Sequence, residues 1–217
     1  MAKIVDVPHS GSIANITYSH NKGGQYIRNR RKPTNPNSTK QQQIRSILST
    51  LSRAWSGLTS TQQAQWNTWT SVNPVIDTLG QSMFLSGQQG YIKLNSRLLQ
   101  SGSTASATPP AVVGPAQLVT MVAAWVSPFA VTVTYTATPL AAGQKLVVYG
   151  TLPASKGRNP NRNQARLLGY SAAAAASPAA ITSPYPALAA QLSNLYVSVM
   201  DASGQISPGL KATVITT

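Results

Sequence analysis

Side chains able to bind anions gather in one stretch near the N-terminus. Between Lys22 and Arg53 the chain carries eight Lys or Arg residues and no acid. Guanidinium groups bind phosphate or carboxylate oxygens, and a tyrosine ring can stack on a nucleic-acid base. The stretch therefore predicts a binding arm for a phosphate backbone, an acidic protein surface or neighbouring subunits. Its candidate binding residues are Tyr26, Arg28, Arg30, Arg31, Lys32 and Lys40.

A second basic segment lies in the C-terminal half. Residues 152–165 contain Lys156, Arg158 and Arg162, together with Pro153 and Pro160. Proline fixes its own backbone angle and removes a hydrogen-bond donor, so it is typical of loops between strands. We predict a long, exposed basic loop here.

The small number of acidic residues argues against catalysis. Seventeen Lys and Arg residues face three acids, Asp6, Asp77 and Asp201, and the sequence contains no Glu and no Cys. Paired catalytic carboxylates and clustered metal ligands are therefore not apparent. Asp6 and His9 could belong to a Ser-His-Asp triad, but no nucleophile elbow accompanies them. We expect a protein that is not an enzyme, with no catalytic residues, no cofactor and no metal.

The charge is unevenly distributed. Residues 1–100 hold 11 basic residues and two acids, which gives +9, and residues 101–217 hold six and one, which gives +5. The N-terminus lacks the long apolar stretch of a signal peptide, and no apolar run approaches the roughly 20 residues that span a bilayer. We expect a soluble protein made in a cytoplasm, without a membrane partner.

The first domain, residues 1–37, is predicted to be a β-hairpin followed by an extended basic arm. A turn at Asn21-Lys22-Gly23-Gly24 separates the expected strands 12–19 and 25–30, and a further short strand is expected at 3–7. Pro33 and Pro36 favour an extended 31–37. Because an isolated hairpin is marginal in water, we expect this one to pair with another sheet or another subunit.

The second domain, residues 38–100, is predicted to be helical. A first helix starts after Ser38 or Thr39 and ends at Gly57, with an apolar stripe at Ile44, Ile47, Leu48, Leu51 and Trp55. A capping box at Thr59 opens a second helix, a short hairpin surrounds Gly80-Gln81, and Ser86 caps a third helix that runs to about Gln100. The three tryptophans Trp55, Trp66 and Trp69 should form a small core.

The remainder, residues 111–217, has the pattern of an antiparallel β-sandwich, joined by a linker at 101–110. Valine and tyrosine alternate with threonine over 130–138, as expected for a strand with one buried face. The fold class is thus α+β and multidomain. The expected strands are 117–125, 130–138, 144–151, 166–173, 195–201 and 209–216.

The N-terminal motifs resemble those of a group of uncharacterised virion-associated proteins of tailed bacteriophages and prophages. The resemblance covers about residues 12–100 and rests on GGxYIRxR at 23–30, PxNPxxT at 33–39, the junction at 55–59, and Leu85-Ser86-Gly87 with Tyr91-Ile92 and Leu94-Asn95. Segments 167–176 and 196–207 resemble the fibronectin type III or immunoglobulin-like sandwich that often follows. The resemblance implies a phage particle as the context and brings no catalytic residues.

This context leads to one expected function and two alternatives. The first is a virion structural protein, most simply a head decoration or cement protein that binds the major capsid protein through its basic arm, as a homo-oligomer in a symmetric particle. A tail-associated or fibre-anchoring virion protein is a variant of it. The alternative from another class is a nucleic-acid-binding protein packaged in the particle. We favour contact with protein over contact with nucleic acid.

Overall fold

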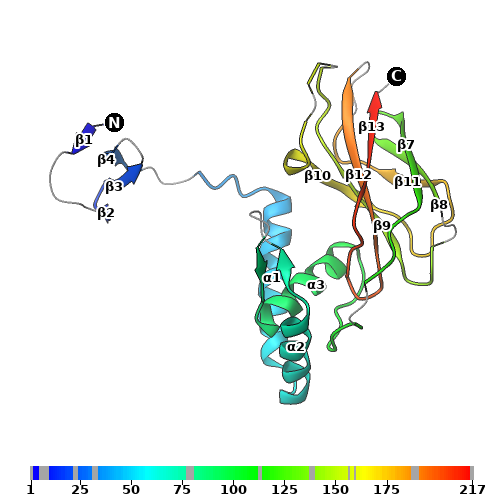
Figure 1. Cartoon of the computed structure of the whole chain (residues 1–217), viewed down its shortest axis with the longest axis horizontal. Helices are drawn as coiled ribbons and strands as arrows, with labels where there is room; N and C mark the ends of the chain where they lie inside the picture. Colours follow the sequence, from blue (N-terminus) through cyan, green and yellow to red (C-terminus); the bar gives the residue numbers. More distant parts are fainter. Residues whose placement is uncertain are drawn as a thin grey trace. The chain divides into compact units, whose positions relative to one another are not determined.

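The computed structural model describes residues 2–4, 10–21, 24–30, 34–76, 81–111, 114–136, 140–155, 157–158, 160–186 and 191–215. These residues form an α+β protein, with an N-terminal sheet, three helices and a sandwich of antiparallel sheets (Figure 1). The chain separates into two compact units, Met1–Gln43 and Ile44–Thr217.

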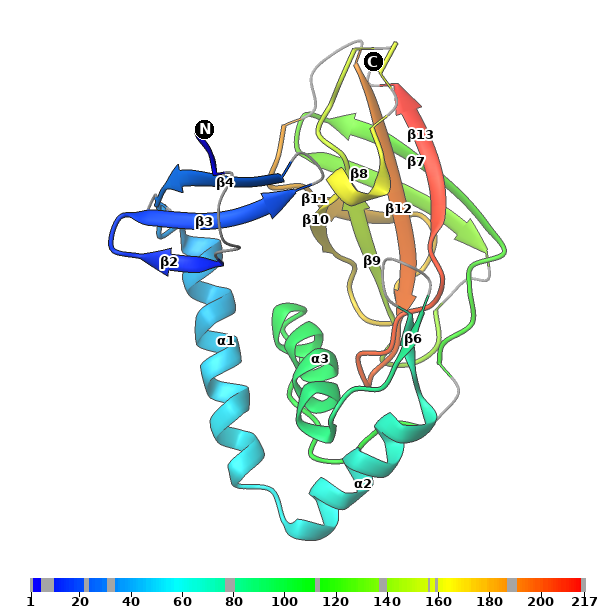
Figure 2. The same cartoon turned by 60° about the vertical axis from the view of Figure 1, so that its left-hand side comes forward.

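The first unit contains a four-stranded antiparallel sheet in the order β1-β4-β3-β2 (Figure 2). Its strands are β1 (Ala2–Ile4), β2 (Gly11–Ile13), β3 (Ile16–Asn21) and β4 (Gly24–Asn29). The predicted hairpin is confirmed, because Asn21 pairs with Gly24 across a two-residue connection that lies outside the described residues. The expectation of one continuous strand over 12–19 is wrong. Ala14 takes a positive φ of 50° and, with Asn15, turns the chain between β2 and β3.

Three helices follow, with ends close to those predicted. They are α1 (Thr39–Ser56), α2 (Ser60–Val72) and α3 (Gly87–Gln100). Capping boxes begin the last two, at Thr59 with Gln62 and at Ser86 with Gln89, because each pair satisfies two backbone N–H groups that a helix start leaves open. The expected short hairpin between α2 and α3 is also present, as β5 (Val75–Ile76) and β6 (Ser82–Met83).

An aromatic cluster joins the three helices. Trp66 of α2 is 1 % exposed, and its ring lies 5.5 Å from that of Tyr91 and 5.8 Å from that of Trp69. Trp55 of α1 also contacts Tyr91. The predicted tryptophan core is therefore confirmed, with Tyr91 at its centre. The indole N–H of Trp66 donates to the carbonyl of Ala107 (2.9 Å), so the segment after α3 is held against the helices.

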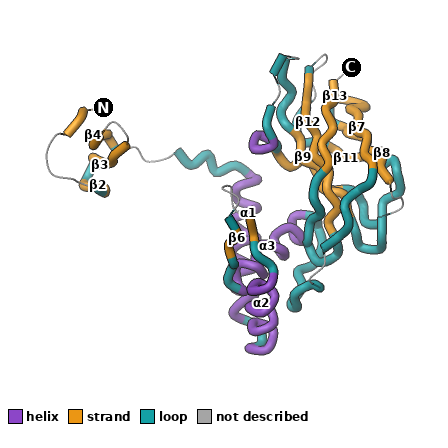
Figure 3. The backbone as a smooth tube through the Cα atoms, viewed as in Figure 1, coloured by secondary structure: helices purple, strands orange, loops and turns teal. Residues whose placement is uncertain are grey.

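Seven strands then build the sandwich (Figure 3). One sheet has the order β11-β8-β7 and the other β10-β9-β12-β13. The fifth strand of the sandwich, β11, therefore pairs with β8 in the sheet that also contains β7. This strand order is that of a fibronectin type III-like sandwich, and the predicted antiparallel sandwich is confirmed. The strands are β7 (Thr120–Ser127), β8 (Ala130–Thr136), β9 (Lys145–Gly150), β10 (Arg166–Tyr170), β11 (Ala179–Thr182), β12 (Leu192–Met200) and β13 (Leu210–Ile215).

The sandwich core lies between these two sheets. Val131, Val133 and Tyr135 of β8 are buried as their alternation with threonine predicts, and they face Leu146 and Val197 of the other sheet within one cluster. Strand β11 was missed by the sequence analysis. It is only four residues long, Ala-Ala-Ile-Thr, and half of it is alanine, which has low β propensity; pairing with β8 is what places it in the sheet.

Helix α3 packs against the outer face of the four-stranded sandwich sheet. Gly204, in the turn after β12, lies so close to α3 that an added Cβ would stand 2.6 Å from the carbonyl oxygen of Leu94. Lys145 of β9 donates to the carbonyl of Ser101 at the end of α3 (2.8 Å). Val147 and Met200, which point to this outer face, are 0 % and 1 % exposed. The helices and the sandwich therefore share a packed junction.

Candidate partner-binding surfaces

One face of the N-terminal sheet is polar and basic. The register places Tyr26 opposite Ser19 and Arg28 opposite Thr17, so these four side chains share a face. Thr17 exchanges a hydroxyl hydrogen bond with Ser12 of β2 (2.9 Å) on the same face. Arg28 is exposed and Tyr26 half-buried. The sequence placed these two residues on one side of the strand, and the register confirms it.

The opposite face of this sheet is apolar, and its described side chains are exposed or half-buried. Ile13 pairs with Ile16, and Tyr18 pairs with Ile27. Ile13 is 72 % exposed and Ile16 39 % exposed. None of the residues with described burial in Met1–Gln43 is buried. A sheet normally buries its apolar face against a second layer, and the described part of this unit supplies none.

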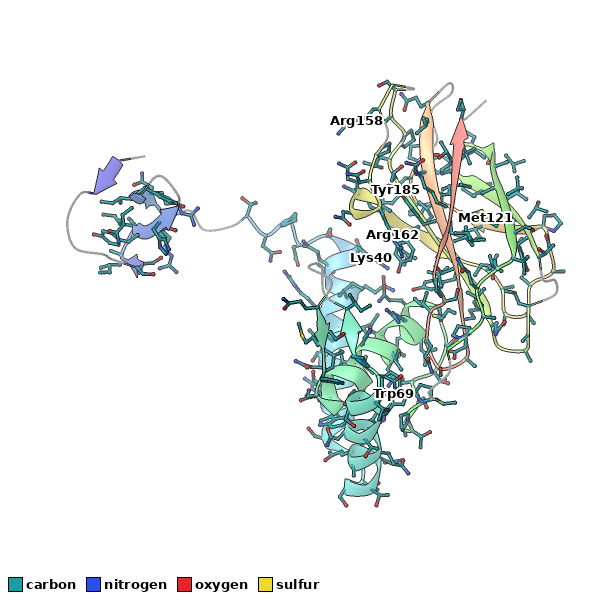
Figure 4. The ribbon with its side chains drawn as sticks, viewed as in Figure 1. Lys40, Trp69, Met121, Arg158, Arg162 and Tyr185 are labelled. Atoms are coloured by element: carbon teal, nitrogen blue, oxygen red, sulfur yellow. The ribbon has the colours of Figure 1, made fainter. Side chains whose placement is uncertain are left out.

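The other predicted arm residues are only partly described. Arg30 is exposed, and its backbone N–H donates to the carbonyl of Asn15, which anchors the start of the arm to the sheet. Arg31 and Lys32 lie outside the described residues. Lys40 belongs to the first turn of α1 rather than to an extended arm, and its ammonium donates to the side-chain carbonyl of Gln43 (3.1 Å). Figure 4 labels Lys40 at this start of α1.

The apolar stripe of α1 is only half covered. Leu51 is 1 % exposed in the helical core, whereas Ile44 and Leu48, two turns and one turn earlier on the same face, are 38 % and 49 % exposed. The sequence predicts the stripe correctly. It could not show that the packing of α1 against α2 and α3 ends before the N-terminal part of the stripe.

The predicted basic loop, 152–165, is pinned to the sandwich rather than freely exposed along its whole length. Ala154 and Leu192 exchange backbone hydrogen bonds of 2.9 Å and 2.8 Å. The side-chain amide of Asn194 donates to the carbonyl of Pro160 (2.8 Å), and Pro160 is buried. Arg158 and Arg162 are exposed, as predicted, and Lys156 lies outside the described residues.

The three arginines of this region have different surroundings. The guanidinium carbon of Arg162 lies 5.8 Å from the ring centre of Tyr196, and that of Arg166 lies 5.5 Å from the ring centre of Tyr185. Arg158 instead lines a pocket together with Arg166. Figure 4 labels Arg158 and Arg162 on the loop before β10 and Tyr185 on the same side of the sandwich. The sequence predicts Arg166 only as the first residue of a strand, and no local pattern indicates that it lines a pocket.

A half-buried cation, Arg97, lies in the junction between α3 and the sandwich. The guanidinium of Arg97 donates to the carbonyl of Gly204 (3.2 Å). Burial lowers the pKa of Arg97 from its ordinary value, an effect that nearby Tyr149 and Tyr170 oppose. Burial, with a contribution from Tyr149, raises the pKa of Tyr170 to about 12. No carboxylate of the described residues is among the groups that shift these pKa values, and we interpret this cluster as a structural contact of the fold.

Asp201 is the single acidic residue within the described part of the chain. Its carboxylate oxygen accepts hydrogen bonds from the backbone N–H groups of Ser203 and Gln205 and from the Ser203 hydroxyl, all within its own turn. Among the described residues, no group of His, Asp or Glu could hold a metal ion, and no helix has the length and apolarity needed to cross a membrane.

Comparison of the sequence with models of known protein families gives no match, and comparison with curated proteins gives no significant similarity.

Proposed function

We propose that this chain is a non-enzymatic structural protein of a bacteriophage particle, most simply a head decoration protein that docks through its N-terminal unit. In this proposal Met1–Gln43 contacts the particle and the sandwich is the rigid body that the contact holds in place. The phage context comes from the sequence motifs, and a tail-associated position remains the nearest variant.

The observation that carries the proposal is the N-terminal sheet, to which the described residues of its own unit add no second layer. Its apolar face holds Ile13, Ile16, Tyr18 and Ile27, and two of these side chains are more than a third exposed. Burying such side chains contributes about 25 cal/mol per Å² of apolar area. A neighbouring protein surface can supply that burial, and symmetric particles repeat such a contact many times.

The charge of the chain favours an acidic partner. Residues 1–100 carry a net +9, from 11 basic residues and two acids. Arg28 and Arg30 are exposed at the end of β4 and the start of the arm. An acidic protein surface would attract this unit and speed its docking, because complementary charge mainly raises the association rate.

Mixing the full chain with undecorated capsids tests the proposal. Saturable co-sedimentation at a fixed ratio to capsid subunits is the expected result. Ile27→Asp, which places a charge on the apolar face of the sheet, should abolish it. Ala172→Asp adds the same charge at an exposed position of the sandwich and should bind normally. Absence of saturable binding, or equal binding by both variants, would contradict docking through the sheet.

A packaged nucleic-acid-binding protein is the second candidate, favoured by one observation. Tyr26 and Arg28 lie side by side on one exposed strand face, an arrangement that suits base stacking next to a phosphate. Binding of this kind weakens steeply with salt, because each neutralised phosphate releases counterions. A DNA titration at two salt concentrations separates the candidates: tight binding with a steep salt slope supports this one, and weak binding without a slope removes it.

A further inference from the structure

A pocket opens in the sandwich between the basic loop and the start of β10. Its volume is ≈ 520 Å³, within the range of small-molecule sites. Arg158 and Arg166 line it, together with the amide side chains of Asn163 and Gln164 and the apolar side chains of Leu152 and Pro153.

Hydrogen bonds to β12 hold the walls of this pocket in place. Ala154 in its lining is bonded in both directions to the backbone of Leu192, and Pro160 is held by the amide of Asn194. The 3₁₀ turn Arg162–Gln164 presents Asn163 and Gln164 from one short segment. A site whose walls are fixed before binding spends little free energy on ordering them, which favours affinity.

The charge in the pocket is positive and lacks a neutralising carboxylate among the described residues. Arg166 is oriented by the ring of Tyr185 at 5.5 Å, and Arg158 is exposed at the same pocket. Asp201, the acid within the described part of the chain, is bonded to Ser203 and Gln205 in its own turn. Two guanidinium groups therefore remain available to an anion from outside.

We propose that this pocket binds a small organic phosphate. A phosphomonoester carries about −1.5 to −2 charges near pH 7 and three acceptor oxygens, which matches two guanidinium groups. A monocarboxylate or a sulfonate carries a single negative charge and would match only one of the two guanidinium groups. The amides of Asn163 and Gln164 can donate further hydrogen bonds, and Leu152 with Pro153 gives an apolar wall for the organic part.

Calorimetric titration of the full chain with phenyl phosphate at pH 8 tests this site. Arg158→Gln and Arg166→Gln should each weaken binding about 10- to 100-fold, the loss expected when hydrogen bonds to a charged group are removed. Arg28→Gln removes the same charge from the N-terminal unit and should leave the affinity unchanged. Absent binding, or an equal loss in all three variants, would overturn the site.

Further ligands separate the parts of the proposal. Inorganic phosphate should bind more weakly than phenyl phosphate, because it does not contact the apolar wall, and benzenesulfonate should bind more weakly because it carries one charge. Equal affinity for inorganic phosphate would overturn the organic part of the ligand, and equal affinity for benzenesulfonate would overturn the charge match. Tyr185→Phe keeps the ring beneath Arg166 and should bind normally, whereas Tyr185→Leu should weaken binding.

Discussion

The chain contains two four-stranded antiparallel sheets whose surroundings differ completely. In the sheet β10-β9-β12-β13, the three-stranded sheet covers one face, and α3 with the 152–165 loop covers the other. Every residue of β12 from Ser193 to Met200 is buried. In the sheet β1-β4-β3-β2, none of the β4 residues is buried.

This difference indicates that the two sheets obtain burial of their apolar side chains in different ways. Strand pairing alone satisfies the backbone hydrogen bonds of both sheets, but burial of apolar side chains is what stabilises a sheet in water. The sandwich obtains that burial from its own chain. The N-terminal sheet exposes its apolar face, and we propose that a partner on a phage particle completes it.

Truncating one apolar side chain in each sheet is the strongest test of the comparison. Leu146→Ala, at a fully buried position of the sandwich core, should lower the free energy of unfolding by about 2–5 kcal/mol. Ile27→Ala in β4 removes a side chain of the same size from an unlayered sheet, and should change the unfolding of the free chain by under about 1 kcal/mol. Denaturant unfolding followed by tryptophan fluorescence measures the first variant, since Trp125 lies in the sandwich, and amide hydrogen exchange of β4 measures the second. Similar losses in the two variants would contradict the contrast.

The contact between α3 and the sandwich gives the second largest expected effect. Gly204→Ala places a methyl group 2.6 Å from the Leu94 carbonyl oxygen and should cost about 1–3 kcal/mol for the overlap. Gly102→Ala is its matched control, because Gly102 also has a positive φ but has nothing within 4 Å of an added Cβ. Thermal unfolding compares the two, and equal losses would show that backbone strain alone matters at Gly204.

The covered junction should also respond to alkaline pH. Burial raises the pKa of Tyr170 from 10.0 to about 12, so the folded state holds this proton more tightly than the unfolded state does. The resulting stabilisation is fully present below pH 10 and is lost as the pH rises from 10 to 12. Absorbance titration at 295 nm should show a phenolate step near pH 12 that Tyr170→Phe lacks. An unchanged titration curve in the variant would contradict this assignment.

The arginines of the N-terminal unit should have the smallest effect on stability. Replacing Arg28, Arg30 and Arg31 together by Ser should change the unfolding free energy of the free chain by no more than about 0.5 kcal/mol, the usual range for surface positions. The same variant should bind undecorated capsids more weakly. Calorimetry and co-sedimentation measure the two quantities, and a large loss of thermal stability would show that these arginines are structural.

Local signals allowed much of the fold to be predicted. The helix caps at Thr59 and Ser86 and the alternation over β8 depend on neighbours in the sequence, and each appears in the structure. Such patterns indicate which face of a helix or strand is apolar. They do not state whether another element covers that face.

The missed features depend on tertiary packing. Ile44 and Leu48 belong to a regular stripe, yet they lie beyond the reach of the helical core. Strand β11 exists because β8 pairs with it. The pocket forms because Arg166 at the start of β10 meets a loop that β12 holds in place, a proximity that no spacing in the sequence encodes.

Amide hydrogen exchange of the free full chain tests the central claim most directly. The amides of β3 and β4 are hydrogen-bonded within a sheet to which the described residues of its unit add no second layer, so they should exchange through local opening of low free energy. The amides of β12 should exchange only through global unfolding. Protection of β3 and β4 equal to that of β12 in the free chain would show that the N-terminal sheet is already complete, and would contradict docking by a sheet that needs a partner.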